Sequence, residues 1–296
     1  MNASTSPQPH VPSLPSVAVV GAGTMGHGIA YVAALTGCSV RLTDANPTVL
    51  DSARERIESL LAGGLKRGKL TEHDRAGVHA RLEAMPQLGD AVAGADVVIE
   101  AVVEDLIAKQ RLLAEVERRA PSSALLATNT SSLSVGQIAA ALKEPGRLIG
   151  MHFFNPVHLM RLVEIVTHAR TSDTQVERAL RIVKLLGKDP IVVQDSPGFA
   201  SSRLGLVLGL EAMRMLEQGV ATAEDIDKAM ELGYNHPMGP LKLTDLVGLD
   251  VRLAIAEYLH RTLKQPQFEP PKILRDKVAR GELGKKSGKG FYAWND

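Results

Sequence analysis

A histidine and a glutamate, His152 and Glu164, have the spacing in this sequence that most directly indicates acid–base chemistry. Two runs of β-favouring residues, 148–154 and 162–167, flank a short segment centred on His158. If the runs form a hairpin, His152 and Glu164 face each other across the strands. An imidazole backed by a carboxylate can remove a hydroxyl proton while hydride leaves the same carbon. Such a pair can also be structural, and only a nearby nicotinamide would favour the catalytic interpretation.

The second chemical pattern is the glycine-rich segment GAGTMG at residues 21–26. It follows a β-favouring run and opens a stretch with apolar residues at helical spacing, which predicts strand, tight turn and helix. In this pattern Gly21 makes the turn, Gly23 lets the backbone approach a pyrophosphate, and Gly26 lets the helix pack on the strand. A glycine cluster alone can mark only a turn.

Asp44 favours a dinucleotide site over a plain turn. It ends the next strand-like run, 39–43, about twenty residues beyond the glycines, where a carboxylate can bind an adenosine ribose. That carboxylate would repel the 2′-phosphate of NADP, and no arginine follows it closely. We therefore expect NAD as the cofactor, with Thr24 and Met25 of the glycine segment among the residues that bind it.

Small polar side chains follow another predicted strand, 124–127, in the sequence TNTSS at 128–132. Ligands of open α/β sheets bind at the carboxyl ends of strands. Capping of the helix that begins near Ser134 explains one of these residues but not five. We include Asn129 and Ser131 among the cofactor-binding residues. A further strand, 96–103, is apolar except for Glu100 and is followed by Glu104.

A basic cluster, Lys66, Arg67 and Lys69, ends an amphipathic helix predicted over 47–66. A second helix, capped by Thr71 and running through Leu82, should follow. The cluster could meet phosphate groups, although composition alone favours a solvated helix end. The same stretch partly matches a phosphate-loop pattern but has Leu70 where Ser or Thr is required, so we reject an NTPase.

Composition excludes several function classes. The 296 residues carry a formal net charge of +1, which indicates neither nucleic acid nor an anionic membrane as a partner. The single cysteine, Cys38, excludes an intramolecular disulfide, and no Cys/His cluster has metal-binding spacing. Residues 1–15, rich in Pro and Ser, should be disordered and lack the features of a targeting signal. We expect a cytoplasmic protein that does not cross a membrane.

Strands and helices alternate up to about residue 193, which predicts an α/β fold with a mostly parallel, doubly wound sheet. After DSPG at 195–198 we find no convincing strand. The helix predicted over 199–216 is apolar nearly all round, so we expect it to be hidden between subunits of a homodimer. The expected organisation is a tail at 1–15, a nucleotide-binding domain at 16–197 and an all-helical dimerisation and substrate domain at 198–296.

With these motifs assembled, the chain resembles the short-chain L-3-hydroxyacyl-CoA dehydrogenases, which include bacterial 3-hydroxybutyryl-CoA dehydrogenases. The resemblance runs from Ser16 to the C-terminus and rests on GAGTMG, TNTSS, HFFNP, DSPGF, HPMGP and GKKSGKGFY. It implies a Rossmann-like domain, a helical dimerisation domain, and NAD-linked oxidation of an acyl-CoA substrate, a 3-hydroxyacyl thioester, in fatty-acid or butanoate metabolism.

The resemblance also implies roles for single residues. His152 of HFFNP matches the general base, and Glu164 matches its partner. Ser131 matches a position that contacts both cofactor and substrate. The other matching positions are Glu104, Lys109, Asn155 and Lys286 for the cofactor, and Ser59, Lys66 and Asn155 for the substrate with its coenzyme A.

One departure from the family pattern concerns the substrate. After the PGF turn the family usually has Asn-Arg, where this chain has Ser202 and Arg203. Serine is shorter but can still donate a hydrogen bond, so we assign Ser202, with Ser131, to the developing carbonyl oxygen. Two other functions stay open: a dehydrogenase of a free hydroxy acid, similar to gulonate dehydrogenases, and a non-catalytic nucleotide-binding relative.

Overall fold

A computed structural model describes residues 14–294 of the chain, which divides into two compact units between Asp195 and Ser196. The predicted disordered tail, residues 1–15, lies outside the described residues apart from its last two. The sequence placed the boundary between the domains after residue 197, two residues later than the division between these units.

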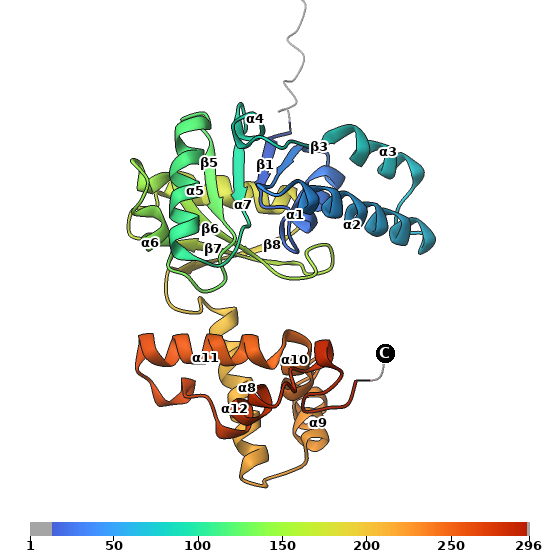
Figure 1. The fold of residues 1–296 in the computed structure, drawn as a ribbon, viewed down its shortest axis with the longest axis vertical. Helices are drawn as coiled ribbons and strands as arrows, with labels where there is room; N and C mark the ends of the chain where they lie inside the picture. The colour runs from blue at the N-terminus through green and yellow to red at the C-terminus, as the bar shows by residue number, and fades with distance from the viewer. Residues whose placement is uncertain (1–13, 295–296) are drawn as a thin grey trace, which may run out of the picture. The chain divides into compact units, whose positions relative to one another are not determined.

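An eight-stranded sheet forms the centre of the first unit (Figure 1). Its strands are β1 (Ser16–Val20), β2 (Ser39–Thr43), β3 (Leu82–Ala84), β4 (Val97–Glu100), β5 (Leu125–Thr128), β6 (Leu148–Phe153), β7 (Leu162–Thr167) and β8 (Asp189–Gln194). The helices of this unit are α1 (Gly26–Leu35), α2 (Pro47–Lys66), α3 (Glu72–Arg81), α4 (Leu88–Val92), α5 (Leu106–Arg119), α6 (Val135–Ala139) and α7 (Asp173–Leu185), with a 3₁₀ turn, η1 (Pro145–Arg147).

The order of the strands is β3-β2-β1-β4-β5-β6-β7-β8. The first six are parallel, β7 runs antiparallel to β6, and β8 runs parallel to β7. The chain order reverses between β1 and β4, which is where ligands bind in doubly wound sheets. This topology confirms the predicted Rossmann-like α/β fold.

Apolar strands dictate this arrangement, because they must be covered on both faces. Side chains from α1, α2 and α7 pack on one face of the sheet in a core that includes Val19, Ile99 and Met151. On the other face α4 and α6 contact the strands, and α5 packs between them. The result is a three-layer unit in which the six parallel strands, β1 to β6, end along one edge of the sheet.

Two short elements were missed in the sequence, and one strand is shorter than predicted. Strand β3 (Leu82–Ala84) lies at the edge of the sheet where the predicted helix included Leu82. Helix α4 (Leu88–Val92) contains a glycine and spans little more than one turn. Strand β4 ends at Glu100 rather than at residue 103, because the chain turns there and the Glu100 carboxylate accepts a hydrogen bond from Val102 N at 2.7 Å.

The second unit is helical, as predicted. It contains α8 (Ser201–Glu217), α9 (Ala223–Gly233), α10 (Pro240–Val247), α11 (Leu249–Leu263), α12 (Lys272–Ala279) and the 3₁₀ turns η2 (Pro266–Phe268) and η3 (Lys285–Ser287). Asp245 accepts hydrogen bonds from Phe291 N, Tyr292 N and Trp294 Nε1 at 2.8–2.9 Å. The GKGFY motif therefore anchors the end of the chain to α10. Among residues 14–294, no helix has the length and apolarity to span a membrane.

Candidate active site

The glycine segment forms the turn between β1 and α1, and two of its three glycines are required by the chain itself. Gly21 has a φ of +102°, and a Cβ atom there would lie 2.6 Å from the carbonyl oxygen of Ala101. A Cβ atom on Gly26 would lie 1.7 Å from the carbonyl oxygen of Gly21. A Cβ atom on Gly23 would have no neighbour within 4 Å among the described residues. Gly23 therefore has the open space that close approach of a ligand phosphate requires.

This difference predicts opposite outcomes for two alanine substitutions. Gly26→Ala should destabilise the fold by about 1–3 kcal/mol, because the methyl group forces the helix away from the turn. Gly23→Ala should leave the unfolding temperature unchanged but weaken NADH binding about tenfold, a loss of ~1.4 kcal/mol from the ligand contact alone. Thermal unfolding and fluorescence titration with NADH measure both quantities, and NADH affinity unchanged in Gly23→Ala would contradict this role.

A pocket of about 770 Å³ lies beside the glycine turn and is lined by Gly21, Gly23, Asp44 and Val103 among others. Asp44 accepts hydrogen bonds from Ala22 N at 2.8 Å and from Asn46 N at 2.9 Å. Its carboxylate thus joins the end of β2 to the glycine turn, at the wall of a pocket large enough for a nucleoside. Thr24 and Met25 complete the turn before α1 begins.

The predicted pairing of His152 with Glu164 is confirmed by the register of β6 and β7. The ring Nδ1 lies 2.8 Å from Glu164 Oε2. Glu164 is fully buried, and His152 is 6 % exposed. Because Glu164 is a hydrogen-bond acceptor when ionised, this contact favours the ring tautomer that carries the proton on Nδ1.

The end of β5 is tied to the end of β6 by Asn129, whose Oδ1 accepts a hydrogen bond from Phe153 N at 2.8 Å. Phe153 directly follows His152. Asn129 is therefore placed to fix the strand end that carries the histidine, in addition to its predicted contact with the cofactor.

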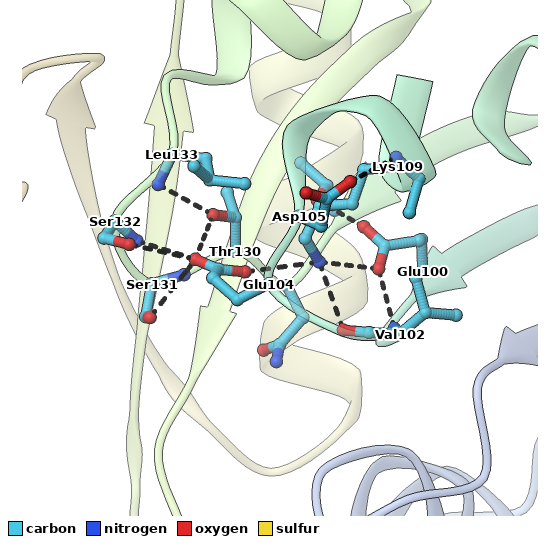
Figure 2. Close-up of polar contacts among 12 residues, drawn as sticks. Glu100, Val102, Glu104, Asp105, Lys109, Thr130, Ser131, Ser132 and Leu133 are labelled. Carbon is cyan, nitrogen blue, oxygen red and sulfur yellow. Dashed lines mark hydrogen bonds and ion pairs between the residues drawn. The ribbon is translucent and has the colours of Figure 1, made fainter. Parts of the chain in front are cut away.

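We call residues Thr128–Ser132 the serine loop, and Glu104 is the side chain that organises it (Figure 2). Glu104 Oε1 accepts hydrogen bonds from Thr130 Oγ1 at 2.6 Å, Ser131 N at 2.9 Å and Ser132 N at 3.0 Å. Burial alone would raise the pKa of Glu104, but the charge of Lys109 and these hydrogen bonds hold it below its usual value. The carboxylate stays ionised and fixes the loop.

The residues predicted to meet coenzyme A lie on the first unit's surface. Ser59 and Lys66 are exposed on α2, two turns apart and so on one face of the helix. Asn155 is exposed in the segment that follows β6. Next to Lys66, Arg67 and Lys69 line a pocket of about 500 Å³ together with His158 and Lys188. Basic side chains therefore gather around the end of α2.

Two predicted site residues belong to the second unit. Ser202 lies in the first turn of α8. Lys286 forms an ion pair with Asp250, with 2.6 Å between the ammonium and the carboxylate. Their assignments to substrate and cofactor remain predictions.

Glu100 was noticed in the sequence only as an interruption of an apolar strand, and its role was missed. It is fully buried and pairs with Lys109 at 2.7 Å. A charged residue in an otherwise apolar strand is the signal that could have indicated it, because a buried carboxylate needs a partner.

No group of three metal-ligating side chains that could hold an ion is found within residues 14–294.

Comparison with known proteins covers both units. Residues 16–196 match the family model for the 3-hydroxyacyl-CoA dehydrogenase NAD-binding domain, and residues 198–294 match the model for the C-terminal domain of the same enzymes. A probable 3-hydroxybutyryl-CoA dehydrogenase of Bacillus subtilis is 42% identical over 280 residues, which cover 95% of this chain and 97% of the relative.

Two solved structures are similar across nearly the whole chain. The crystal structure of (S)-3-hydroxybutyryl-CoA dehydrogenase from Ralstonia eutropha has a TM-score of 0.92 and 40% identity, covering 96% of this chain and 100% of that one. A diketoreductase has a TM-score of 0.83 at 27% identity, again covering 96% of this chain and 100% of that one.

Proposed function

The chain belongs to the 3-hydroxyacyl-CoA dehydrogenase family, and on that premise we propose that it oxidises (S)-3-hydroxybutyryl-CoA to the 3-oxoacyl thioester with NAD, or catalyses the reverse reduction. The observation that carries the proposal is the buried pair of His152 and Glu164. The strands of this pair belong to the same sheet as β1, which leads into a glycine turn suited to a dinucleotide.

The residues of the first unit fit an NAD molecule, and each has a proposed role in binding it. Gly21, Gly23 and the amides at the start of α1 would meet the pyrophosphate, and Asp44 would meet the adenosine ribose. Bound NAD supplies the hydride acceptor. His152 then takes the proton of the 3-hydroxyl group on Nε2, while Glu164 stabilises the imidazolium that forms. Ser131 and Ser202 donate hydrogen bonds to the oxygen that becomes a carbonyl.

Preference for NAD over NADP rests on Asp44. The wild-type protein should use NAD at least about tenfold better than NADP, because a carboxylate opposes the 2′-phosphate. In Asp44→Asn this ratio of kcat/KM values should fall severalfold toward one. The ratio is the quantity to measure, since Asp44 also holds Ala22 and its loss affects both cofactors alike. A wild-type preference for NADP would contradict the assignment.

Acceptance of coenzyme A distinguishes this function from a free hydroxy acid dehydrogenase. The basic end of α2, with Lys66, Arg67 and Lys69, favours a substrate that carries phosphate groups. An assay of NADH formation with (S)-3-hydroxybutyryl-CoA and with free 3-hydroxybutyrate separates the two functions. Activity with the thioester supports the proposal, activity only with the free acid supports the rival, and no activity with either supports a non-catalytic nucleotide-binding protein.

We also propose a homodimer formed through the helical unit. That unit exposes large apolar side chains, among them Leu204 at 73% and Leu232 at 84%. Leu204 lies on α8, the helix that the sequence predicts to be hidden between subunits, so its exposed apolar side chain supports the proposed dimer. Light scattering that finds only monomer at micromolar concentration would contradict the dimer.

A cytoplasmic location stays a prediction from the sequence, which cell fractionation tests.

A further inference from the structure

Arg252, on α11, carries a buried positive charge that the described part of the chain does not pair. The residue is only 7% exposed. Within residues 14–294 its Nε has no hydrogen-bond partner, and no carboxylate forms an ion pair with its guanidinium. Burial lowers the pKa of Arg252 to about 10, so the group is still charged at neutral pH. Because an unpaired buried charge is strongly destabilising, this guanidinium needs an anion from another source.

The acidic residues of the neighbouring helices are engaged by other groups. Asp250, two residues before Arg252, forms an ion pair with Lys286. Asp245 on α10 accepts the hydrogen bonds of the GKGFY segment. Glu257 on α11 pairs with an arginine of α12 at 2.7 Å. The carboxylates of α10 and α11 are therefore all committed.

The guanidinium lies against the first half of α8, which packs on α11 in the second unit (Figure 1). A Cβ atom on Gly205 would lie 3.7 Å from Arg252 Nη1, so the guanidinium sits beside the backbone of α8. Ser202 precedes Gly205 by three residues and therefore lies on the same face of the helix, about 5–6 Å away. The charge is thus about one helical turn from the serine that we assign to the reacting oxygen.

A second unused polar group lies one turn further along the same face of α8. The hydroxyl of Thr244, on α10, is fully buried and has no hydrogen-bond partner among the described residues. A Cβ atom on Gly209 would lie 3.0 Å from that oxygen. The face of α8 that carries Ser202, Gly205 and Gly209 therefore borders two polar groups whose hydrogen-bonding capacity is unmet.

A carboxylate is the group that suits this place. The planar fork of a guanidinium matches the two oxygens of a carboxylate, and such charge-assisted pairs are among the strongest hydrogen bonds. The phosphate groups of coenzyme A are already assigned to the basic end of α2. Three carbon–carbon bonds of about 1.5 Å each span about 4 Å. A carboxylate two methylene groups beyond the hydroxyl-bearing carbon would therefore reach from Ser202 to Arg252.

We propose that Arg252 binds a carboxylate at the end of the acyl chain, so that the protein prefers 3-hydroxyacyl-CoA substrates whose chain ends in a carboxylate to uncharged chains of the same length. Arg252 takes no part in the transfer of the proton or the hydride. This inference rests on the proposed function, in which Ser202 meets the reacting oxygen.

Two substrates with six-carbon acyl chains test the inference, because they differ only at the end of the chain. (S)-3-Hydroxyadipyl-CoA ends in a carboxylate, and (S)-3-hydroxyhexanoyl-CoA ends in a methyl group. The ratio of their kcat/KM values, charged over uncharged, should exceed about ten in the wild type. In Arg252→Met this ratio should fall about a hundredfold, the size of effect expected when one partner of a buried charge pair is truncated. The ratio is the quantity to measure, since damage to the fold lowers both values alike.

The control is Arg261→Met on the same helix. Arg261 is exposed in the last turn of α11, so this variant removes the same charge from the outer side of the helix. Its ratio of kcat/KM values should stay within about twofold of the wild-type ratio, as for most surface substitutions.

Thermal unfolding gives a readout that needs no substrate. Because the described chain supplies no partner for Arg252, the Arg252→Met protein should unfold at the wild-type temperature or above it. A much lower unfolding temperature would show that the guanidinium serves the fold, and the inference would be overturned.

The remaining outcomes separate the inference from the proposed function. A wild-type ratio near one or below it would overturn the inference and leave the proposed function intact. If Arg252→Met also dissociates to monomers in light scattering, the guanidinium pairs with a carboxylate of a second copy instead. A wild-type protein that is inactive with every 3-hydroxyacyl thioester, (S)-3-hydroxybutyryl-CoA included, would reject the proposed function and the inference with it.

Discussion

Replacing His152 with alanine should lower kcat for (S)-3-hydroxybutyryl-CoA by about 10²–10⁴-fold, the usual contribution of a general acid–base group. The substitution removes the group that accepts the hydroxyl proton, so hydride transfer would have to proceed against a developing oxonium charge. The residues assigned to the dinucleotide, among them Gly23 and Asp44, do not include His152. The NADH dissociation constant should therefore change little. Steady-state kinetics and NADH fluorescence measure the two quantities.

A second buried histidine provides the control for this variant. His168 lies just after β7, and its Nε2 contacts the carbonyl oxygen of Leu148 at 3.0 Å. His168→Gln perturbs a buried imidazole of the same unit without removing the proposed base, so its kcat should remain near that of the wild type. Equal losses in the two variants would mean that His152 is needed for structure and not for proton transfer.

Replacing Glu164 with glutamine should have the next largest effect, a loss in kcat on the order of 10²–10³-fold. The amide is close in shape to the carboxylate, but its NH₂ group can donate to Nδ1 of His152 and so place the ring proton on Nε2. In that tautomer Nε2 cannot accept the proton of the substrate. The lost charge also no longer stabilises the imidazolium.

Glu164→Asp separates charge from shape at the same position. It keeps the carboxylate but draws it back from Nδ1, so its kcat should fall between those of the wild type and Glu164→Gln. Thermal unfolding of all three proteins reports any general damage to the strand pair. A Glu164→Gln enzyme with kcat within about threefold of the wild type would show that the carboxylate does not serve His152.

The contact between His152 and Glu164 could be predicted from sequence because it is a matter of backbone register. The segment between the two strands is too short for a parallel crossover, which requires a dozen or more residues, so only a hairpin fits. In a hairpin, the centre of the turn fixes which residues face each other. The apolar strands, the glycine turn and the capped helices were likewise predictable, since each depends on local pattern.

Side-chain connections between distant elements could not be predicted in this way. Glu104 and Ser131 lie in the segments that follow β4 and β5, and Glu104 meets the loop through Oε1 while its Oε2 lies 3.4 Å from Lys109 Nζ. Strand β3 was missed because it has three residues, one of them the exposed Glu83, and gives no alternating pattern long enough to detect. Such features depend on packing and are not encoded in local spacing.

The proposed mechanism requires His152 to meet the reacting oxygen, and a structure of the protein with both NAD and acetoacetyl-CoA bound tests this most directly. We expect His152 Nε2 within about 3.2 Å of the 3-oxo oxygen, with Glu164 still hydrogen-bonded to Nδ1. A bound thioester whose 3-oxo oxygen lies beyond the reach of His152, or beside a different acid–base side chain, would contradict the mechanism.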